Sequence, residues 1–219
     1  MKFTTSKQIT IILISIFLFL FLSIFRDDLV CLDETIYAWL TAHQSPMIFS
    51  IMKRFTNIGS GEMILFVALI IAVILSIKRL WMYVTFILVV TFGGMFINLL
   101  LKMTFQRGRP GEARELEVFG YSLDITSYSF PSGHTMRIVL LFLVFILLCH
   151  RFMKHGTLKV ISISVLTGIP VLVAISRIMI GAHFFTDILA AIFISIVWFQ
   201  LCYLLFTKKF RFDKGTGFH

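Results

Sequence analysis

The fold is decided by residues 176–206, which read SRIMIGAHFFTDILAAIFISIVWFQLCYLLF. A polar cluster that includes Arg177, His183 and Asp187 opens this stretch, and no charged residue follows until Lys208. An apolar run of about 20 residues can cross the hydrocarbon core of a bilayer as a helix. A charge or imidazole at the end of such a run is costly unless it has a partner or a task. The stretch therefore predicts a membrane helix with a functional site at one end.

The rest of the chain repeats this pattern. Hydrophobic residues make up 58% of the 219 residues and charged residues 14%, whereas an ordinary soluble domain has about 25% charged residues. No linker or change of composition divides the chain, so we expect a single domain over residues 1–219. The predicted fold class is an all-α, integral membrane bundle of six transmembrane helices, at about residues 9–25, 60–77, 80–101, 132–149, 158–178 and 187–206.

Two of the predicted connections are long. Residues 27–62 hold apolar residues at helical spacing, interrupted at Ser45-Pro46, and this pattern predicts short interfacial helices with Tyr37 and Trp39 at headgroup depth. Residues 103–130 are polar and rich in glycine. We expect them to form a cap over the site, in which residues 112–117 could add one helical turn.

The distribution of charge predicts how the bundle is oriented. One face carries most of the positive charge and a single acid, Asp213, and by the positive-inside rule this face is cytoplasmic; its basic residues are Lys2, Lys7, Lys78, Arg79, Arg151, Lys154, Lys159, Lys208, Lys209, Arg211 and Lys214. Both termini are then cytoplasmic, and the polar clusters lie at the outer face of the cell membrane. The net charge of +9 falls in short connections rather than in a basic run with aromatics, so no nucleic-acid partner is expected.

Three polar clusters mark the outer ends of the predicted helices. They are Lys102 to Arg109-Pro110, Pro131-Ser132-Gly133-His134, and Ser176-Arg177 to His183 and Asp187. In the second, Pro131 favours a first helical turn, a serine can cap it, and the amides of Gly133 and His134 then form a site for an anion. Together the clusters predict one phosphate site.

The residue types in these clusters indicate phosphoryl transfer. His183 and Asp187 share a helix face, so the carboxylate can orient the imidazole and leave its other nitrogen as a nucleophile. A second histidine can supply a proton, while Lys102, Arg109 and Arg177 bind the phosphate oxygens. Such chemistry needs mainly positioning and charge, so neither a metal nor another cofactor is expected.

Order, spacing and membrane placement of the three clusters resemble the signature of the type 2 phosphatidic acid phosphatase superfamily. The resemblance covers about the last two-thirds of the chain. It implies a six-helix membrane phosphatase that works without magnesium through a phosphohistidine intermediate. By position, His183 would be the nucleophile, Asp187 its orienting partner and His134 the general acid. The phosphate-binding residues implied are Lys102, Arg109, Ser132, Gly133 and Arg177.

The sequence therefore predicts a lipid phosphatase whose substrate is a membrane lipid. Undecaprenyl diphosphate, phosphatidylglycerophosphate and phosphatidate all remain open, as does the oligomeric state. The alternatives are a lipid phosphotransferase with the same site, a haloperoxidase, which would need a soluble scaffold, and a transporter or flippase, which would place its charges near the bilayer centre. Arg137, one turn beyond His134, either faces the site or pairs with an acid such as Glu62, and we expect a structural pairing rather than a direct phosphate contact.

Overall fold

The computed structural model describes residues 5–110, 116–118, 121–123 and 128–210. In chain order the elements are α1 (Thr5–Ile24), α2 (Val30–Thr41), α3 (Pro46–Phe55), the 3-10 helix η1 (Thr56–Gly59), α4 (Gly61–Ile77), α5 (Trp81–Phe105), β1 (Leu116–Val118), β2 (Tyr121–Leu123), α6 (Gly133–Phe152), α7 (Thr157–Met179) and α8 (Phe185–Phe210). The predicted all-α class is confirmed, with one short antiparallel hairpin added by β1 and β2.

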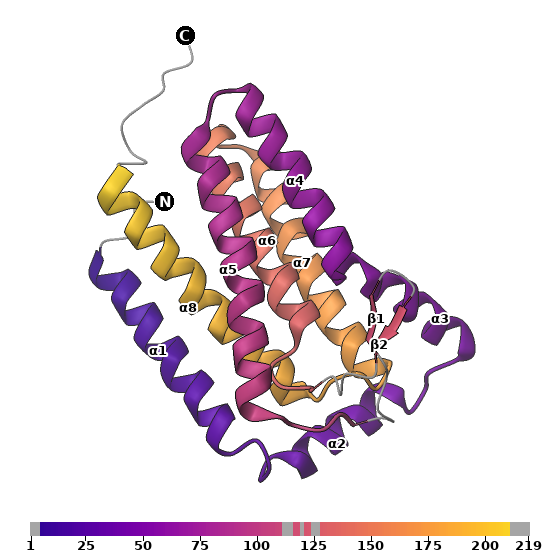
Figure 1. Ribbon diagram of the computed structural model, residues 1–219. Helices are drawn as coiled ribbons and strands as arrows, with labels where there is room; N and C mark the ends of the chain where they lie inside the picture. Colours follow the sequence, from indigo (N-terminus) through magenta and orange to yellow (C-terminus); the bar gives the residue numbers. More distant parts are fainter. Residues whose placement is uncertain (1–4, 111–115, 119–120, 124–127, 211–219) are drawn as a thin grey trace.

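Six long apolar helices form the body of the molecule (Figure 1). Five of them, α1, α5, α6, α7 and α8, are each long and apolar enough to cross a membrane. The sixth candidate is α4, which continues from residues 46–59 through a bend of 46° and meets the test together with them. The described residues therefore contain the six predicted spans if the bent pair counts as one span, and five if it does not.

Central helix α6 packs against α4, α5, α7 and α8, while α1 lies along α8 (Figure 1). Small residues let the helices approach, as is usual in membranes. At Gly94 of α5 an added Cβ would stand 2.2 Å from the Leu140 side chain of α6, and at Gly93 one would stand 2.4 Å from the Trp198 ring of α8. The Trp198 indole donates to the Val90 carbonyl at 3.1 Å, which fixes the ring at this contact.

The connection between α1 and α4 forms the two short helices that the sequence predicts. α3 begins at Pro46, and the Ser45 hydroxyl caps it by accepting from the Ile48 amide at 3.3 Å. α2 lies across the end of the bundle at which α5 ends and α6 and α8 begin (Figure 1). Of residues 103–130, the first three extend α5, and β1 pairs with β2 further along. The helical turn considered near residues 112–117 falls mostly outside the described residues, as do residues 119–120 and 124–127.

Replacing Gly94 by valine should destabilise the bundle, because the neighbouring Leu140 side chain is buried and has little room to move. We expect a loss of about 1–3 kcal/mol, the range for overpacked sites. Gly168→Val is the matched control, since it also lies within a membrane helix but has nothing within 4 Å of an added Cβ. Thermal unfolding of both variants in detergent measures the difference, and equal melting temperatures would contradict the packing described.

Candidate active site

A side-chain cap starts α6 at the second predicted cluster. The Ser132 hydroxyl oxygen accepts from the Thr135 amide at 3.4 Å and from the Thr135 hydroxyl at 3.0 Å. Because Ser132 is the cap, Pro131 precedes the helix instead of standing in its first turn as predicted. Gly133 lies so close to α5 that an added Cβ would stand 2.9 Å from Asn98 Oδ1. The Asn98 amide in turn donates to the Pro131 carbonyl at 3.2 Å and holds this segment on α5.

The third cluster forms a tight turn between α7 and α8. The amides of Ala182 and His183 donate to the Arg177 carbonyl at 3.0 and 3.3 Å, which folds the chain back at the end of α7. Asp187 Oδ2 accepts from the Phe184 amide at 3.0 Å, as the third residue of a capping box does. His183 is 2% exposed. Its Nδ1 lies 3.5 Å from Asp187 Oδ2, so the carboxylate faces the imidazole as expected. His183 lies in the turn before α8, however, so the two residues do not share a helix face as the spacing predicted.

Backbone hydrogen bonds join the three clusters. The Ser132 amide donates to the Asp187 carbonyl at 3.1 Å, which ties the start of α6 to the start of α8. The Ser129 amide donates to the Arg107 carbonyl at 2.8 Å, which ties the same segment to the loop after α5. Residues more than 50 positions apart in the chain thus meet at one end of the bundle.

The three predicted phosphate-binding cations reach this end from different elements. Lys102, in the last turn of α5, is half-buried and donates to the Tyr128 carbonyl. Arg109 is half-buried in the loop that follows. Arg177, at the end of α7, is buried and donates to the Thr56 hydroxyl of η1 at 3.3 Å. The charges of Arg109 and Arg177 act on both Lys102 and His183, so the three cations lie near one another and near His183.

Arg137 faces the site, which is one of its two expected arrangements, while the charge of Glu62 acts on it from beyond ion-pair distance. In the described residues it makes no ion pair with Glu62; instead its Nε contacts the Gly59 carbonyl at 3.5 Å and its Nη2 contacts His134 Nδ1 at 3.3 Å. A guanidinium can only donate, so Nδ1 of His134 is the acceptor and the ring proton is assigned to Nε2. Arg137 therefore acts on the imidazole that was predicted to be the general acid.

Sequence reasoning missed two charged residues at the centre of the site. Arg107 Nη1 donates to Asp187 Oδ1 at 2.7 Å, and its Nη2 donates to Asp33 Oδ2 at 3.0 Å. The Arg107 guanidinium also lies over the Phe184 ring, 4.2 Å from its centre. The sequence did contain a signal that Arg107 belongs to the site, because it stands two residues before Arg109 in the first cluster. Asp33 gave none, because the spacing in α2 marks it only as one polar residue of an interfacial helix.

Burial lowers the pKa of His183 well below its ordinary value of 6.5, and the positive charges of Arg177, Lys102 and Arg109 lower it further. The Ser129 backbone acts in the opposite direction through a hydrogen bond. His183 is therefore neutral at pH 7, which leaves a ring nitrogen with a lone pair. A neutral imidazole oriented by a carboxylate and surrounded by cations has the properties of a nucleophile for a phosphate.

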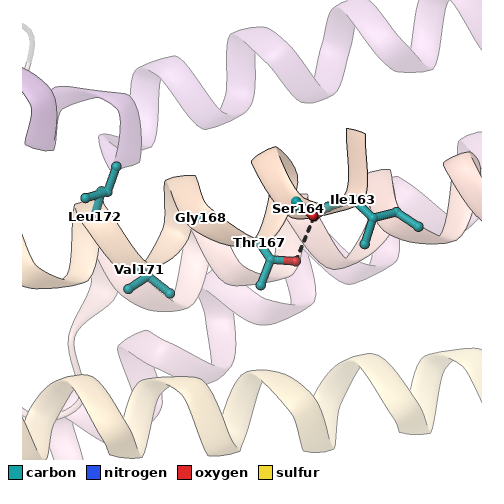
Figure 2. A pocket seen from close by; sticks show the side chains of 6 residues that line it. All are labelled: Ile163, Ser164, Thr167, Gly168, Val171 and Leu172. Carbon is teal, nitrogen blue, oxygen red and sulfur yellow. Dashed lines mark hydrogen bonds between the residues drawn. The ribbon is translucent and has the colours of Figure 1, made fainter. Parts of the chain in front are cut away.

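A pocket on α7 lies apart from these residues. It is lined by Ile163, Ser164, Thr167, Gly168, Val171 and Leu172, all from a single helix (Figure 2). The Thr167 hydroxyl donates to the Ile163 carbonyl at 2.8 Å, so its hydrogen is used within the helix. The pocket has no charged residue among its lining and contains none of the predicted site residues.

Comparison with known proteins places the chain in a family. The family model of the PAP2 superfamily matches residues 83–211, more than half of the chain and all three clusters. The chain belongs to the PAP2 superfamily. The resemblance predicted from the three clusters is therefore confirmed, and with it the prediction that the chain is an enzyme of a membrane phosphatase family.

Two relatives and two solved structures extend this comparison. Phosphatidylglycerophosphatase B of Bacillus subtilis is 29% identical over 197 residues, which cover 86% of this chain and 91% of the relative. Lipid A 1-phosphatase of Rhizobium johnstonii is 29% identical over 124 residues, 55% of this chain and 46% of the relative. A transmembrane PAP2-type phosphatidylglycerolphosphate phosphatase from Bacillus subtilis superposes with a TM-score of 0.69 and 27% identity, covering 90% of this chain and 98% of the other. Aquifex aeolicus LpxE shares the fold, with a TM-score of 0.59 and 19% identity over 79% of this chain and 95% of the other.

Asn98→Ala should loosen the segment that precedes α6. The substitution leaves the Pro131 carbonyl without its side-chain donor in a buried place, which costs about 1–3 kcal/mol. Asn57→Ala, at an exposed position of η1, is the control and should be near neutral. Thermal unfolding in detergent compares the two variants, and equal stability would show that Asn98 does not hold the segment.

The depressed pKa of His183 predicts how stability depends on pH. His183 takes up a proton near pH 6.5 in the unfolded chain, whereas its lowered pKa keeps it neutral in the folded chain. The stability that this difference contributes is complete above pH 6.5 and is lost as the pH falls through the folded-state pKa. Replacing His183 by glutamine removes the proton uptake. The unfolding free energy of wild type should therefore fall more steeply below pH 6.5 than that of His183→Gln. Parallel slopes in denaturation experiments would contradict a neutral, buried His183.

Proposed function

We propose that the chain is a single-domain membrane lipid phosphatase that hydrolyses a lipid phosphate or diphosphate at the outer leaflet through a phosphohistidine. The observation that carries this proposal is the meeting of the three clusters around His183. Its imidazole is buried and neutral, Asp187 faces one ring nitrogen, and Lys102, Arg109 and Arg177 supply positive charge. A phosphate monoester at pH 7 carries the opposite charge.

The proposed reaction has two steps. His134 first binds a second proton, which the negative charge of the bound lipid phosphate favours. His183 then attacks phosphorus through Nε2, the bond from phosphorus to the lipid oxygen breaks, and the His134 imidazolium gives a proton to the leaving oxygen and becomes neutral. A water molecule then attacks the phosphohistidine and returns a proton to His134, and inorganic phosphate leaves with His183 regenerated. Asp187 holds the Nδ1 proton of His183 and balances the positive charge of the imidazolium. The cations balance the phosphate oxygens in both steps, so no metal ion is needed for this role.

The charge distribution supports an outer-leaflet site. The start of α1, the turn between α4 and α5 and the turn between α6 and α7 lie at the end of the bundle opposite the site (Figure 1). At or next to them in the chain are six basic residues of the predicted cytoplasmic face, which are Lys7, Lys78, Arg79, Arg151, Lys154 and Lys159. α1 begins and α8 ends at that end too (Figure 1). By the positive-inside rule the site then opens to the outside, where a lipid headgroup can enter from the bilayer.

The relatives narrow the class of substrate. One is a phosphatidylglycerophosphatase and the other a lipid A 1-phosphatase, so both act on phosphate groups of membrane lipids. We propose phosphatidylglycerophosphate, phosphatidate or undecaprenyl diphosphate as the substrate of this chain. The deciding experiment gives all three lipids to the purified protein in detergent, with and without EDTA, and measures phosphate release. Absence of release from every lipid would overturn the proposal, and loss of activity in EDTA would overturn its metal-free mechanism.

Adding an acceptor lipid to the same assay tests whether the phosphoryl group is transferred to a lipid alcohol instead of to water. Added acceptor lipid would then lower the release of free phosphate and yield a phosphorylated acceptor. A hydrolase gives the same phosphate release with and without the acceptor.

His183→Ala should abolish turnover, with a loss of about three orders of magnitude or more, because no other group in the proposal attacks phosphorus. Lys53→Ala is the control, since Lys53 is exposed in the last turn of α3 and should leave activity nearly unchanged. Trapping with radiolabelled lipid phosphate, followed by alkaline gel electrophoresis, should label wild type and not His183→Ala. Equal labelling of both would rule out His183 as the nucleophile.

A further inference from the structure

Arg107 and Asp33 form a buried hydrogen-bond network behind the His183–Asp187 pair. Arg107 is 7% exposed and Asp33 is 1% exposed. Besides its bonds to Asp33 and Asp187, Arg107 donates to the Thr186 hydroxyl at 2.8 Å and to the Arg26 carbonyl at 2.8 Å. One guanidinium therefore joins the start of α8 to α2 and to the chain before it.

Asp33 is also bound to the N-terminus of α8 directly. Its Oδ1 accepts from the Thr186 amide at 2.9 Å, and its Oδ2 accepts from the Thr186 hydroxyl at 2.7 Å. The amides of a first helical turn have no acceptor within their own helix, so Asp33 acts as a cap supplied by another element. The cap lies one residue from Asp187, and its loss would free the turn that carries the carboxylate.

The charges of this network have a consequence for His183. Asp33, Arg107 and Asp187 are two carboxylates and one guanidinium, with a net charge of one negative. Without Asp33, the ion pair between Arg107 and Asp187 would be neutral, and the carboxylate that faces His183 would be balanced already. With Asp33 present, one negative charge remains for the positive charge that develops on His183 when it attacks phosphorus.

We propose that Asp33 and Arg107 are positioning residues that fix the Asp187 carboxylate and give their network one net negative charge on the Asp187 side of His183. The inference rests on the proposed phosphatase function. It assigns a role in the site to α2, which carries Asp33 and lies before residues 83–211, the range that the family model matches.

The inference is tested by the acid limb of the pH profile of kcat/KM, which reports the ionisation of His183. Charged and titratable groups from five other places act on this imidazole: Asp187 of α8, Arg177 of α7, Lys102 of α5, His134 of α6 and Arg109 of the loop after α5. They are unchanged in variants of Asp33 and Arg107. Comparison with wild type on the same lipid also cancels the titration of the substrate.

Asp33→Asn removes a negative charge, so the acid limb should move to lower pH by about half a unit, and kcat should fall about tenfold with KM within about twofold. Arg107→Gln removes a positive charge, so its limb should move to higher pH. Glu34→Gln is the matched control: it loses the same charge as Asp33→Asn at the next, exposed position of α2 and should behave as wild type. Melting temperatures of the variants identify any that are unfolded.

The acid limbs of the two variants are expected to shift in opposite directions. If only one of the two variants folds, its acid limb should shift in the direction stated for it above. Unmoved limbs, shifts in one common direction, or an Asp33→Asn variant indistinguishable from Glu34→Gln would overturn the inference while phosphate release by wild type stands. Failure of wild type to release phosphate from any lipid would instead overturn the proposed function.

Discussion

The site depends on one buried guanidinium. Arg107 binds Asp187 on α8, Asp33 on α2 and the Arg26 carbonyl in the turn between α1 and α2, while its own carbonyl accepts from the Ser129 amide before α6. Taking a charge out of water costs several kcal/mol unless partners replace the lost hydration. The Arg107 side chain therefore has a strong preference for the one arrangement in which these separate segments meet. The geometry of the His183–Asp187 pair follows from that arrangement.

The bilayer explains why the convergence occurs at an end of the bundle. Within the hydrocarbon core every backbone group must be satisfied inside its helix, and charges are excluded unless paired. Helix ends and the turns between them are the places where amides, carbonyls and charged side chains can gather. The Ser132 amide on the Asp187 carbonyl and the Asn98 amide on the Pro131 carbonyl use these groups to hold the helix ends together.

Much of this could be predicted from the sequence because its signals are local. Apolar runs mark the long helices, and Ser45-Pro46 marks the start of α3. The spacing of His183 and Asp187 places both in one turn, and the clusters at one face predict a shared site. Family resemblance then assigned roles that the residues alone left open between the two histidines.

The remaining features depend on partners distant in the sequence. Nothing near Asp33 shows that it will be buried against α8, since that depends on how α2 crosses the end of the bundle. Arg137 is one turn from His134, but only the packing of α6 against η1 brings its guanidinium to both the Gly59 carbonyl and the His134 imidazole. Residues 103–130 hold glycines that suit either a turn or a hairpin, and pairing between β1 and β2 decides between them.

The residues that hold the arginines of the site in place come from a different part of the chain than the arginines themselves. Each of three arginines at the site has a partner in residues 26–59: Arg107 has Asp33, Arg177 has Thr56, and Arg137 has the Gly59 carbonyl. All three arginines lie in the family range 83–211, and all three partners lie before it. The signature residues therefore supply the groups for a phosphate, while α2 and η1 hold their arginines in place. A change in the N-terminal segment can then alter the site without touching a signature residue.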